Sequence, residues 1–286
     1  MDAIVFAGGI TQPNEALYGY SEGEPKALID VAGKPMIQWT LDALSQARTI
    51  DHVIIVGLTD RSKLACAKPL TYLPNEGRLL ENVKAGAAKV LEVNPRAKYA
   101  LLVSSDTPAI TGEMIDWIVN ACQETKDDLY YNVIRREAME ERFPMSKRTY
   151  TRLKDMEVCG GDTNMVRLAI VNENSDFWNQ VFDARKSPVE QAALLGPDIL
   201  FRLVFRQLTA DDVIQRVAGK LGLKGRALVC PYPEVGMDVD KPHQLEMLRA
   251  DLAARGRRQR AQATPVRRVA GRARAKKRPA TKSRAR

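Results

Sequence analysis

Apolar runs alternate with amphipathic stretches over the N-terminal part of the chain. Short runs typical of buried strands lie at 3–7, 53–58, 70–74 and 100–104. Segments with apolar residues at helical spacing lie between and after them, at 36–48, 79–93 and 112–123. Because strand, helix and strand follow each other at the length of a crossover unit, the strands should be parallel. The pattern predicts a Rossmann-like three-layer α/β/α sandwich with a mostly parallel sheet.

The pattern changes after Asp127 and Asp128. Alternating strand-like segments lie at 129–135, 149–154 and 165–171, with a charged, helical or irregular stretch between the first two. We interpret this part as an antiparallel ribbon inserted into the sandwich and covering the ligand site. The chain then returns to helices at 176–185, 189–195, 198–208 and 213–221, a strand at 225–230 and a helix at 243–255.

Composition narrows the classes of protein and of metal site. The 286 residues are 45% hydrophobic, yet no apolar run reaches the length of about 18 residues that a membrane span needs. The first residues resemble a strand rather than a signal peptide. Four cysteines without CxxC spacing indicate free thiols in a reducing cytoplasm, and two histidines exclude a histidine-rich metal centre. Any metal should therefore have oxygen ligands, which favours Mg²⁺ or Mn²⁺.

The positive charge is concentrated at the C-terminal end of the sequence. The net charge is +9, but residues 255–286 hold 14 of the 44 Lys and Arg residues and no Asp or Glu. The remainder is mildly acidic. A segment with almost no large apolar residue cannot form a core, so we expect a domain at 1–254 and a disordered basic tail at 255–286. The tail could bind nucleic acid or anionic surfaces non-specifically, or serve only for solubility.

The first strand ends at a pair of glycines. Gly8 and Gly9 leave backbone N–H groups at the carboxyl edge of the sheet, where open α/β sheets bind phosphate. Lys26 follows a polar loop and would return a positive charge to that edge. A glycine pair alone is most often just a tight turn, so the interpretation depends on the residues that follow.

The joint pattern is strand, Gly-Gly, loop, Pro25-Lys26-Ala27-Leu28, then Gly33-Lys34-Pro35-Met36. It resembles the nucleotidyltransferase superfamily with a glycosyltransferase-A-like fold, including the molybdenum cofactor guanylyltransferase and cytidylyltransferase group. The resemblance implies that Ala7, Gly8 and Gly9 wrap an NTP triphosphate and that Lys26 neutralises its charge. This chain departs from the usual G-x-G-T/S-R loop, because no Arg or Lys lies between Gly9 and Lys26.

The same resemblance implies a nucleotide-base site farther along the chain. The segment from Pro74 to Asn82 resembles the family's base-recognition loop, in which Asn75 and Gly77 would approach the base. A plain turn before a helix explains the same residues.

Two aspartates match the family's metal ligands. Asp106 follows the most hydrophobic strand in Ser105-Asp106-Thr107-Pro108, and Asp240 precedes Lys241-Pro242 near the end of the domain. The resemblance implies that both coordinate Mg²⁺ or Mn²⁺, with Asp238 as the alternate to Asp240. Each aspartate could instead be a helix N-cap.

The glycine pair in the ribbon carries the remaining candidates. Gly161, Asp162 and Asn164 would bind a polar acceptor if this part of the chain acts as it does in the resembling family. A bulged hairpin explains the same residues.

These features predict a cytoplasmic, Mg²⁺-dependent nucleotidyltransferase. It would transfer an NMP group from an NTP to a small phosphorylated acceptor and release pyrophosphate, with Lys26 and Asp106 as its catalytic residues. Two alternatives remain: a glycosyltransferase that uses NDP-sugars, and a non-catalytic nucleotide-binding protein. The first would usually carry a D-x-D pair at a mid-sheet strand, whereas the D-x-D here is Asp238-Val239-Asp240.

Overall fold

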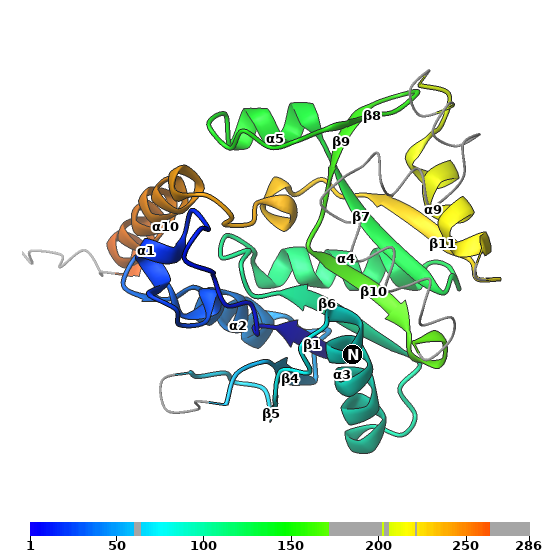
Figure 1. The fold of residues 1–286 in the computed structure, drawn as a ribbon, viewed down its shortest axis with the longest axis horizontal. Coiled ribbons are helices and arrows are strands. Elements are labelled where there is room, and N and C mark those ends of the chain that lie inside the picture. The colour runs from blue at the N-terminus through cyan, green and yellow to red at the C-terminus, as the bar shows by residue number, and fades with distance from the viewer. Residues whose placement is uncertain (60–63, 172–201, 203–205, 221, 264–286) are drawn as a thin grey trace, which may run out of the picture.

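One mixed sheet of nine strands organises the protein. The computed structural model describes residues 1–59, 64–171, 202, 206–220 and 222–263 (Figure 1). The sheet order is β5-β4-β1-β6-β10-β7-β9-β8, and β11 pairs with the other side of β7. The strands are β1 Asp2–Phe6, β4 His52–Val56, β5 Leu70–Leu73, β6 Tyr99–Ser104, β7 Leu129–Arg135, β8 Thr151–Arg152, β9 Glu157–Gly160, β10 Thr163–Arg167 and β11 Gly225–Val229.

The N-terminal half of this sheet is parallel. Strand β1 lies between β4 and β6, with Asp2 opposite His52 on one side and Ala100 on the other. Its side chains alternate between two hydrophobic cores, because successive strand residues point to opposite faces. Ala3 belongs to one core and Ile4 to the other. Buried on both faces, these strands need the unbroken apolar runs that the sequence shows.

Helices cover both faces of the sheet, as Figure 1 shows. Apolar residues of α2 (Met36–Gln46), α4 (Gly112–Gln123) and α10 (Pro242–Ala263) join one core. Those of α3 (Leu79–Val93) and α9 (Ala210–Lys220) join the other. The predicted three-layer α/β/α sandwich is therefore confirmed. The boundaries predicted for α2, α3 and α4 agree to within about two residues, the usual uncertainty of helix ends.

The antiparallel ribbon forms the other half of the sheet. Strand β7 pairs with β10 and then with β9 along one side, both antiparallel, and β10 continues antiparallel onto β6. Two strands are shorter than predicted. The segment 165–171 leaves the sheet after Arg167 and becomes a short 3₁₀ helix, η2 (Leu168–Ile170), and 149–154 keeps only β8. Helix α5 (Arg136–Arg142) starts the charged segment.

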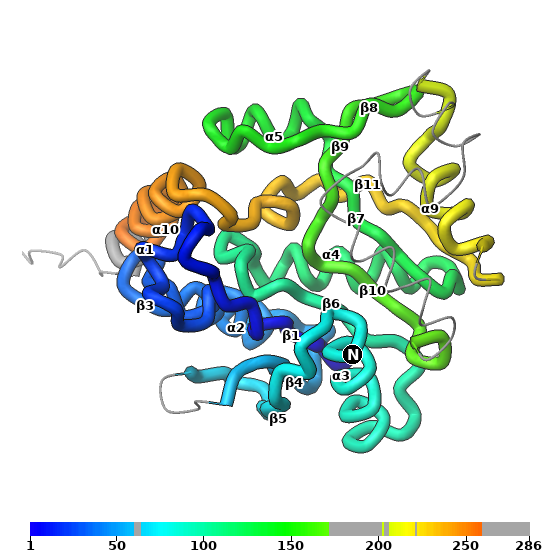
Figure 2. Tube along the Cα trace, viewed as in Figure 1, coloured from blue at the N-terminus to red at the C-terminus, as the bar shows by residue number. Residues whose placement is uncertain are grey.

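The loop after β1 folds against the last helix. It contains α1 (Tyr18–Ser21) and the 3₁₀ helix η1 (Lys26–Leu28), followed by a two-stranded sheet of β2 (Asp30–Val31) and β3 (Lys34–Pro35). The segment from Lys26 to Val31 is therefore divided between η1 and β2. The guanidinium of Arg249 on α10 lies 5.4 Å from the Tyr20 ring centroid and donates to Asp30 O. Figure 2 shows α1 beside α10.

Helix α10 ends later than predicted. It runs to Ala263, eight residues past the helix end predicted at 255, and a further short 3₁₀ helix, η4 (Pro233–Gly236), precedes it. The helices predicted at 176–185 and 189–195, and most of 198–208, lie outside the described residues. Among the described helices none is long and apolar enough to cross a membrane. All four cysteines are free thiols.

Candidate active site

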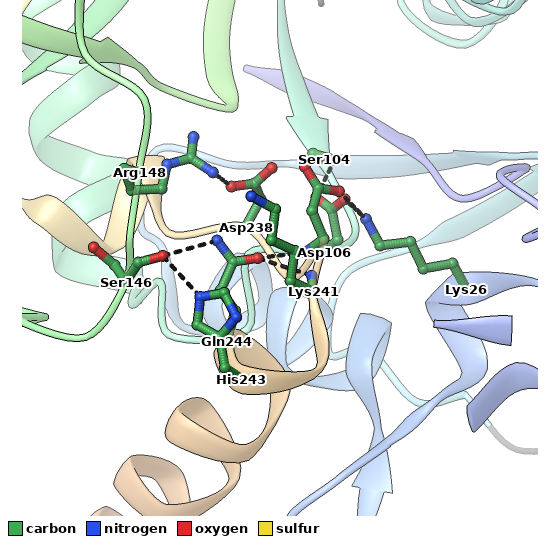
Figure 3. A network of polar contacts seen from close by, with 10 residues as sticks. Lys26, Ser104, Asp106, Ser146, Arg148, Asp238, Lys241, His243 and Gln244 are labelled. Atoms are coloured by element: carbon green, nitrogen blue, oxygen red, sulfur yellow. Dashed lines mark hydrogen bonds and ion pairs between the residues drawn. The ribbon is translucent and has the colours of Figure 1, made fainter. Parts of the chain in front are cut away.

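Lys26, Asp106 and Asp240 meet at the carboxyl edge of the sheet although they lie 80 and 214 residues apart. The Lys26 ammonium donates to Asp106 Oδ2 and Asp240 Oδ1, each at 2.7 Å (Figure 3). Lys26 begins η1, Asp106 follows β6, and Asp240 precedes α10. The N-cap of α4 is Thr111, which accepts from Met114 N. Asp106 is therefore not the cap of that helix, and its carboxylate faces Lys26 instead.

The Asp106 and Asp240 carboxylates stabilise the positive charge of Lys26. Burial alone would lower the pKa of the Lys26 amine, but the Asp106 and Asp240 carboxylates outweigh it and raise that pKa above its usual value. The lysine is therefore cationic at any physiological pH. Because the side chains of Lys26 and Asp106 are only 17% and 18% exposed, this ion pair is screened less than a surface pair.

A third carboxylate, Asp238, completes an acidic group. Oxygen atoms of Asp106, Asp238 and Asp240 all lie within 4.8 Å of one another. A carboxylate group of this kind matches the oxygen ligands that Mg²⁺ and Mn²⁺ prefer. The Lys26 ammonium already bridges two of the three, so the group accommodates a cation. We call these three residues the acidic group. Sequence reasoning treated Asp238 as an alternate to Asp240, whereas the fold brings both to Asp106.

The loop that starts at Gly8 and Gly9 and returns to Lys26, here called the glycine loop, is closed at its base. Lys26 N donates to Gly9 O at 2.8 Å, and Ile10 forms a β-bridge with Pro25. Although residues 10 and 25 lie 15 positions apart in the sequence, the loop between them returns to its start, and Lys26 lies beside Gly9. Ala7 N donates to Val56 O within the sheet. In the part of the chain that the structure describes, nothing accepts a hydrogen bond from the N–H of Gly8 or Gly9.

The predicted base-recognition residue Asn75 touches the glycine loop. Its amide donates to Gly8 O at 2.9 Å, and its Oδ1 accepts from Gly77 N and from the Asn82 amide, both at 3.0 Å. Asn82 Oδ1 also accepts from Glu76 N at 2.8 Å. The Asn75 side chain thus holds two loops together. The fold brings Asn75 and Gly77 beside Gly8, and the Asn75 side chain is occupied by these contacts.

Two glycines allow the chain segments around Gly8 to pack this closely, at a contact here called the glycine junction. Gly57 has φ +104, and a Cβ there would lie 2.3 Å from Gly8 Cα. A Cβ on Gly8 would in turn lie 2.8 Å from the Asn75 side chain. Sequence reasoning found Gly8 but missed Gly57 and Asn82. A glycine directly after a buried strand was the available signal for Gly57.

Hydrogen bonding distinguishes the three predicted acceptor residues of the ribbon, Gly161, Asp162 and Asn164. Asn164 Oδ1 accepts from Asn132 N, and its amide donates to Gly161 O, so this side chain bridges the break between β9 and β10. Gly161 N is also used, by Asn132 O. The alternative of a bulged hairpin is not what forms, because β9 and β10 both pair antiparallel with β7 and Gly161 and Asp162 form a bulge between them. Of the three acceptor candidates, Asp162 alone keeps a side-chain oxygen without a partner among the described residues.

Asp162 lies close enough to the acidic group to feel its charge. Burial, together with the negative charges of Asp106 and Asp240, raises the pKa of its carboxyl group to about 7, and the positive charges of Arg148 and Lys26 oppose this rise. Its backbone N donates to Val235 O, and its backbone O accepts from Ser104 N. Asp162 therefore connects the ribbon to the strand that carries Asp106.

Most of the candidate site lies in a region that matches a known protein family. The model of the MobA-like NTP transferase domain matches residues 3–180 of this chain. That range is more than half of the sequence and contains the glycine loop, Lys26 and Asp106. The chain belongs to the MobA-like NTP transferase family. The resemblance seen in the opening motif is thereby confirmed.

Curated relatives of this family member are nucleotidyltransferases. The mitochondrial 3-deoxy-manno-octulosonate cytidylyltransferase of Arabidopsis thaliana is 26% identical over 211 residues, which are 72% of this chain and 64% of that protein. A probable molybdenum cofactor guanylyltransferase of Thermococcus gammatolerans is 28% identical over 120 residues, 42% of this chain and 56% of that protein. The matched region thus spans about three fifths of the relatives' own length.

Solved structures share the fold over a longer range. A hypothetical transferase from Thermus thermophilus is 33% identical with a TM-score of 0.72, covering 85% of this chain and 98% of that one. A CMP:2-keto-3-deoxy-manno-octonic acid synthetase in complex with CTP gives a TM-score of 0.53 at 14% identity, covering 89% and 99%. The second likeness concerns the fold alone.

Proposed function

We propose that this family member is a divalent-metal-dependent nucleotidyltransferase that moves an NMP group from an NTP to a small phosphorylated acceptor. The observation that carries the proposal is the meeting of Lys26 with the acidic group beside the glycine loop. Phosphoryl-transfer sites need these parts: N–H donors for phosphate, a cation for developing charge and carboxylates for a metal.

The roles of the residues follow from where the charges lie. The N–H groups of Gly8 and Gly9 would hold the triphosphate, and Lys26 would turn from the carboxylates to the phosphates. The acidic group would hold Mg²⁺ or Mn²⁺, which supplies charge neutralisation on the phosphate oxygens when bound. Asn75 and Gly77 would shape the base site.

The reaction needs little acid–base help from the protein. An oxygen of the acceptor phosphate, already ionised at neutral pH, would form a bond to the α-phosphorus. The bond from that phosphorus to the bridging oxygen would break, and pyrophosphate would leave with the electron pair. Positioning and charge stabilisation therefore carry the catalysis.

The first test is stabilisation by ligand. Thermal unfolding is measured with each of the four NTPs, with and without Mg²⁺ or Mn²⁺. We expect one NTP to raise the melting temperature in a metal-dependent way, because a ligand that binds the folded state stabilises it. A shift with NDP-sugars alone would contradict the proposal and favour a glycosyltransferase.

The second test separates an enzyme from a nucleotide-binding protein. Pyrophosphate release is followed with the stabilising NTP and a panel of phosphorylated acceptors. Lys26→Ala should lower kcat/KM by about 10²–10³-fold, the usual effect of losing one such electrostatic contact. Lys89→Ala is the matched control, because Lys89 pairs only with Glu92 on the surface of α3 in the described structure. Full turnover by Lys26→Ala would contradict the assignment.

We further propose a cytoplasmic location and a separate basic segment. Support comes from the four free cysteines, three of them buried, which suit a reducing compartment. The basic residues after 254 begin on α10 and continue beyond the described structure. A gel-shift comparison of the full chain with a 1–263 variant tests whether the segment beyond α10 binds nucleic acid.

A further inference from the structure

Two cations reach the acidic group from opposite sides. Lys26 comes from the glycine-loop side and pairs with Asp106 and Asp240. Arg148 comes from the ribbon side and forms an ion pair with Asp238. Figure 3 shows the two side chains flanking the carboxylates. Arg148 had no signal in the sequence, because it lies in an irregular segment.

Arg148 is held in place by the backbone of the residues before it. Ser146 is buried, and its carbonyl accepts from the side chains of His243 and Gln244, each at 3.2 Å. Lys147 takes the left-handed conformation, with φ 50. Such a conformation is strained in a residue other than glycine and persists only when the surroundings enforce it. The fold therefore holds Lys147 in an unfavourable backbone conformation, and Arg148 points toward Asp238.

Gln244 ties this segment to the acidic group. While its amide donates to Ser146 O, its Oε1 accepts from Asp240 N and Lys241 N, both at 2.9 Å. One buried side chain thus fixes the positions of Arg148 and of Asp240 relative to each other. Gln244 is a positioning residue for both.

We propose that Arg148 forms the subsite for an oxyanion of the acceptor, a phosphate or a carboxylate group. The inference rests on the proposed nucleotidyl transfer and names the part of the site that the acceptor would occupy. The planar guanidinium suits either anion, because its donors match two oxygens at once. Its side chain is only 15% exposed, and its Nε has no partner among the described residues.

Reaction geometry places the acceptor on the side of Arg148. In-line displacement requires the attacking and leaving oxygens to lie on opposite sides of the phosphorus. The leaving pyrophosphate would lie with Gly8, Gly9 and Lys26. The acceptor must then approach from the opposite side, which is the ribbon side, where Arg148 supplies a positive charge.

Charge balance explains why Arg148 is paired with Asp238 beforehand. Without metal, Lys26 and Arg148 offset two of the three negative charges of the acidic group. With a metal bound there, Asp238 would exchange Arg148 for the metal ion, and the guanidinium would be left to bind an anion. The subsite should therefore form only in the metal-bound protein.

The experiment uses the full chain saturated with Mn²⁺ and with the α,β-methylene analogue of the NTP that stabilises it best. This analogue cannot release pyrophosphate. Binding of inorganic phosphate and of gluconate is then measured by calorimetry at constant ionic strength, for wild type, Arg148→Gln, Arg148→Lys and Arg152→Gln. Arg152 is the matched control, because it lies on the same ribbon, is 58% exposed and pairs with Glu157.

We expect Arg148→Gln to weaken binding of the preferred anion at least tenfold, Arg148→Lys to weaken it less, and Arg152→Gln to leave it within twofold. The stronger of the two probes identifies the oxyanion as phosphate or carboxylate. In the nucleotide-free protein, Arg148→Gln should bind Mn²⁺ several-fold more tightly, measured by electron paramagnetic resonance, because Asp238 has lost its competing cation.

Two results would overturn the inference while the proposed function stands: neither anion binds wild type that holds Mn²⁺ and nucleotide, or Arg148→Gln binds the anion as tightly as wild type. If Arg148→Gln does not fold, Arg148→Lys decides, and unchanged anion affinity in that variant overturns the inference. Failure of wild type to bind Mn²⁺ and nucleotide overturns both proposals.

Discussion

The two halves of the sheet use their polar residues differently. In the parallel half, strands end at one edge, and the residues after them turn toward the site: Gly8 after β1, and Asp106 after β6. In the antiparallel half, polar side chains mostly complete the sheet itself, as Asn132 and Asn164 do across the bulge. Parallel strands therefore gather functional groups by topology, whereas the ribbon must deliver Arg148 through a strained and anchored segment.

The strongest test of the parallel half is Asp106→Asn, which keeps the shape of the side chain and removes its charge. We expect pyrophosphate release to fall about 10³-fold, because this carboxylate faces both Lys26 and the proposed metal position. Mn²⁺ affinity, measured by electron paramagnetic resonance, should fall in parallel. Asp51→Asn is the control, since Asp51 is exposed and pairs with the N-terminus. A loss of less than tenfold would show that Asp106 is not a ligand.

The glycine junction should be the next most sensitive feature. Gly57→Ala would force a Cβ into Gly8 and a side chain into φ +104. We expect the free energy of unfolding to fall by about 2 kcal/mol or more, measured by urea denaturation. Gly19→Ala is the control, because a Cβ there meets no atom within 4 Å. Equal midpoints for the two variants would refute the close approach.

Asn82 tests whether the base site depends on positioning. Asn82→Ala removes the partner of Asn75 and of Glu76 N, so the turn should loosen. We expect KM for the NTP to rise about tenfold with kcat little changed, since one buried hydrogen bond is worth about 1–1.5 kcal/mol. Discrimination between NTPs should weaken as well. Asn82→Asp keeps the acceptor for Glu76 N and should have an intermediate effect; a change in kcat alone would argue against a positioning role.

The last prediction concerns the ribbon, through Asp162. Its pKa is raised to about 7, above the usual value for an aspartate, so the folded protein binds the proton more tightly than the unfolded chain. The resulting stability is fully present below about pH 4 and is lost as pH rises toward 7. Asp162→Asn should remove this dependence, so its stability relative to wild type should increase between pH 5 and pH 8 in urea denaturation. An unchanged difference across that range would contradict the raised pKa.

Sequence patterns predicted the parallel half well for a physical reason. Strands buried on both faces require unbroken apolar runs, and their carboxyl ends must meet at one edge. The positions of Gly8 and Asp106 at strand ends were therefore enough to predict that they share an edge, and the resemblance to the family's motifs pointed to Lys26 and Asp240. The short strands of the ribbon carried a weaker signal, and Arg167 ends β10 four residues before the predicted boundary.

The sequence by itself determined the three-layer sandwich, because local periodicity and parallel topology constrain it, and its motifs indicated the family and the residues of the candidate site. Only the tertiary structure decided that Asp238 joins the acidic group, that Asn75 serves as a brace and that Arg148 faces Asp238. These depend on contacts between segments far apart in the chain, through Gln244 and Asn82, and such contacts leave no periodic trace in residue order.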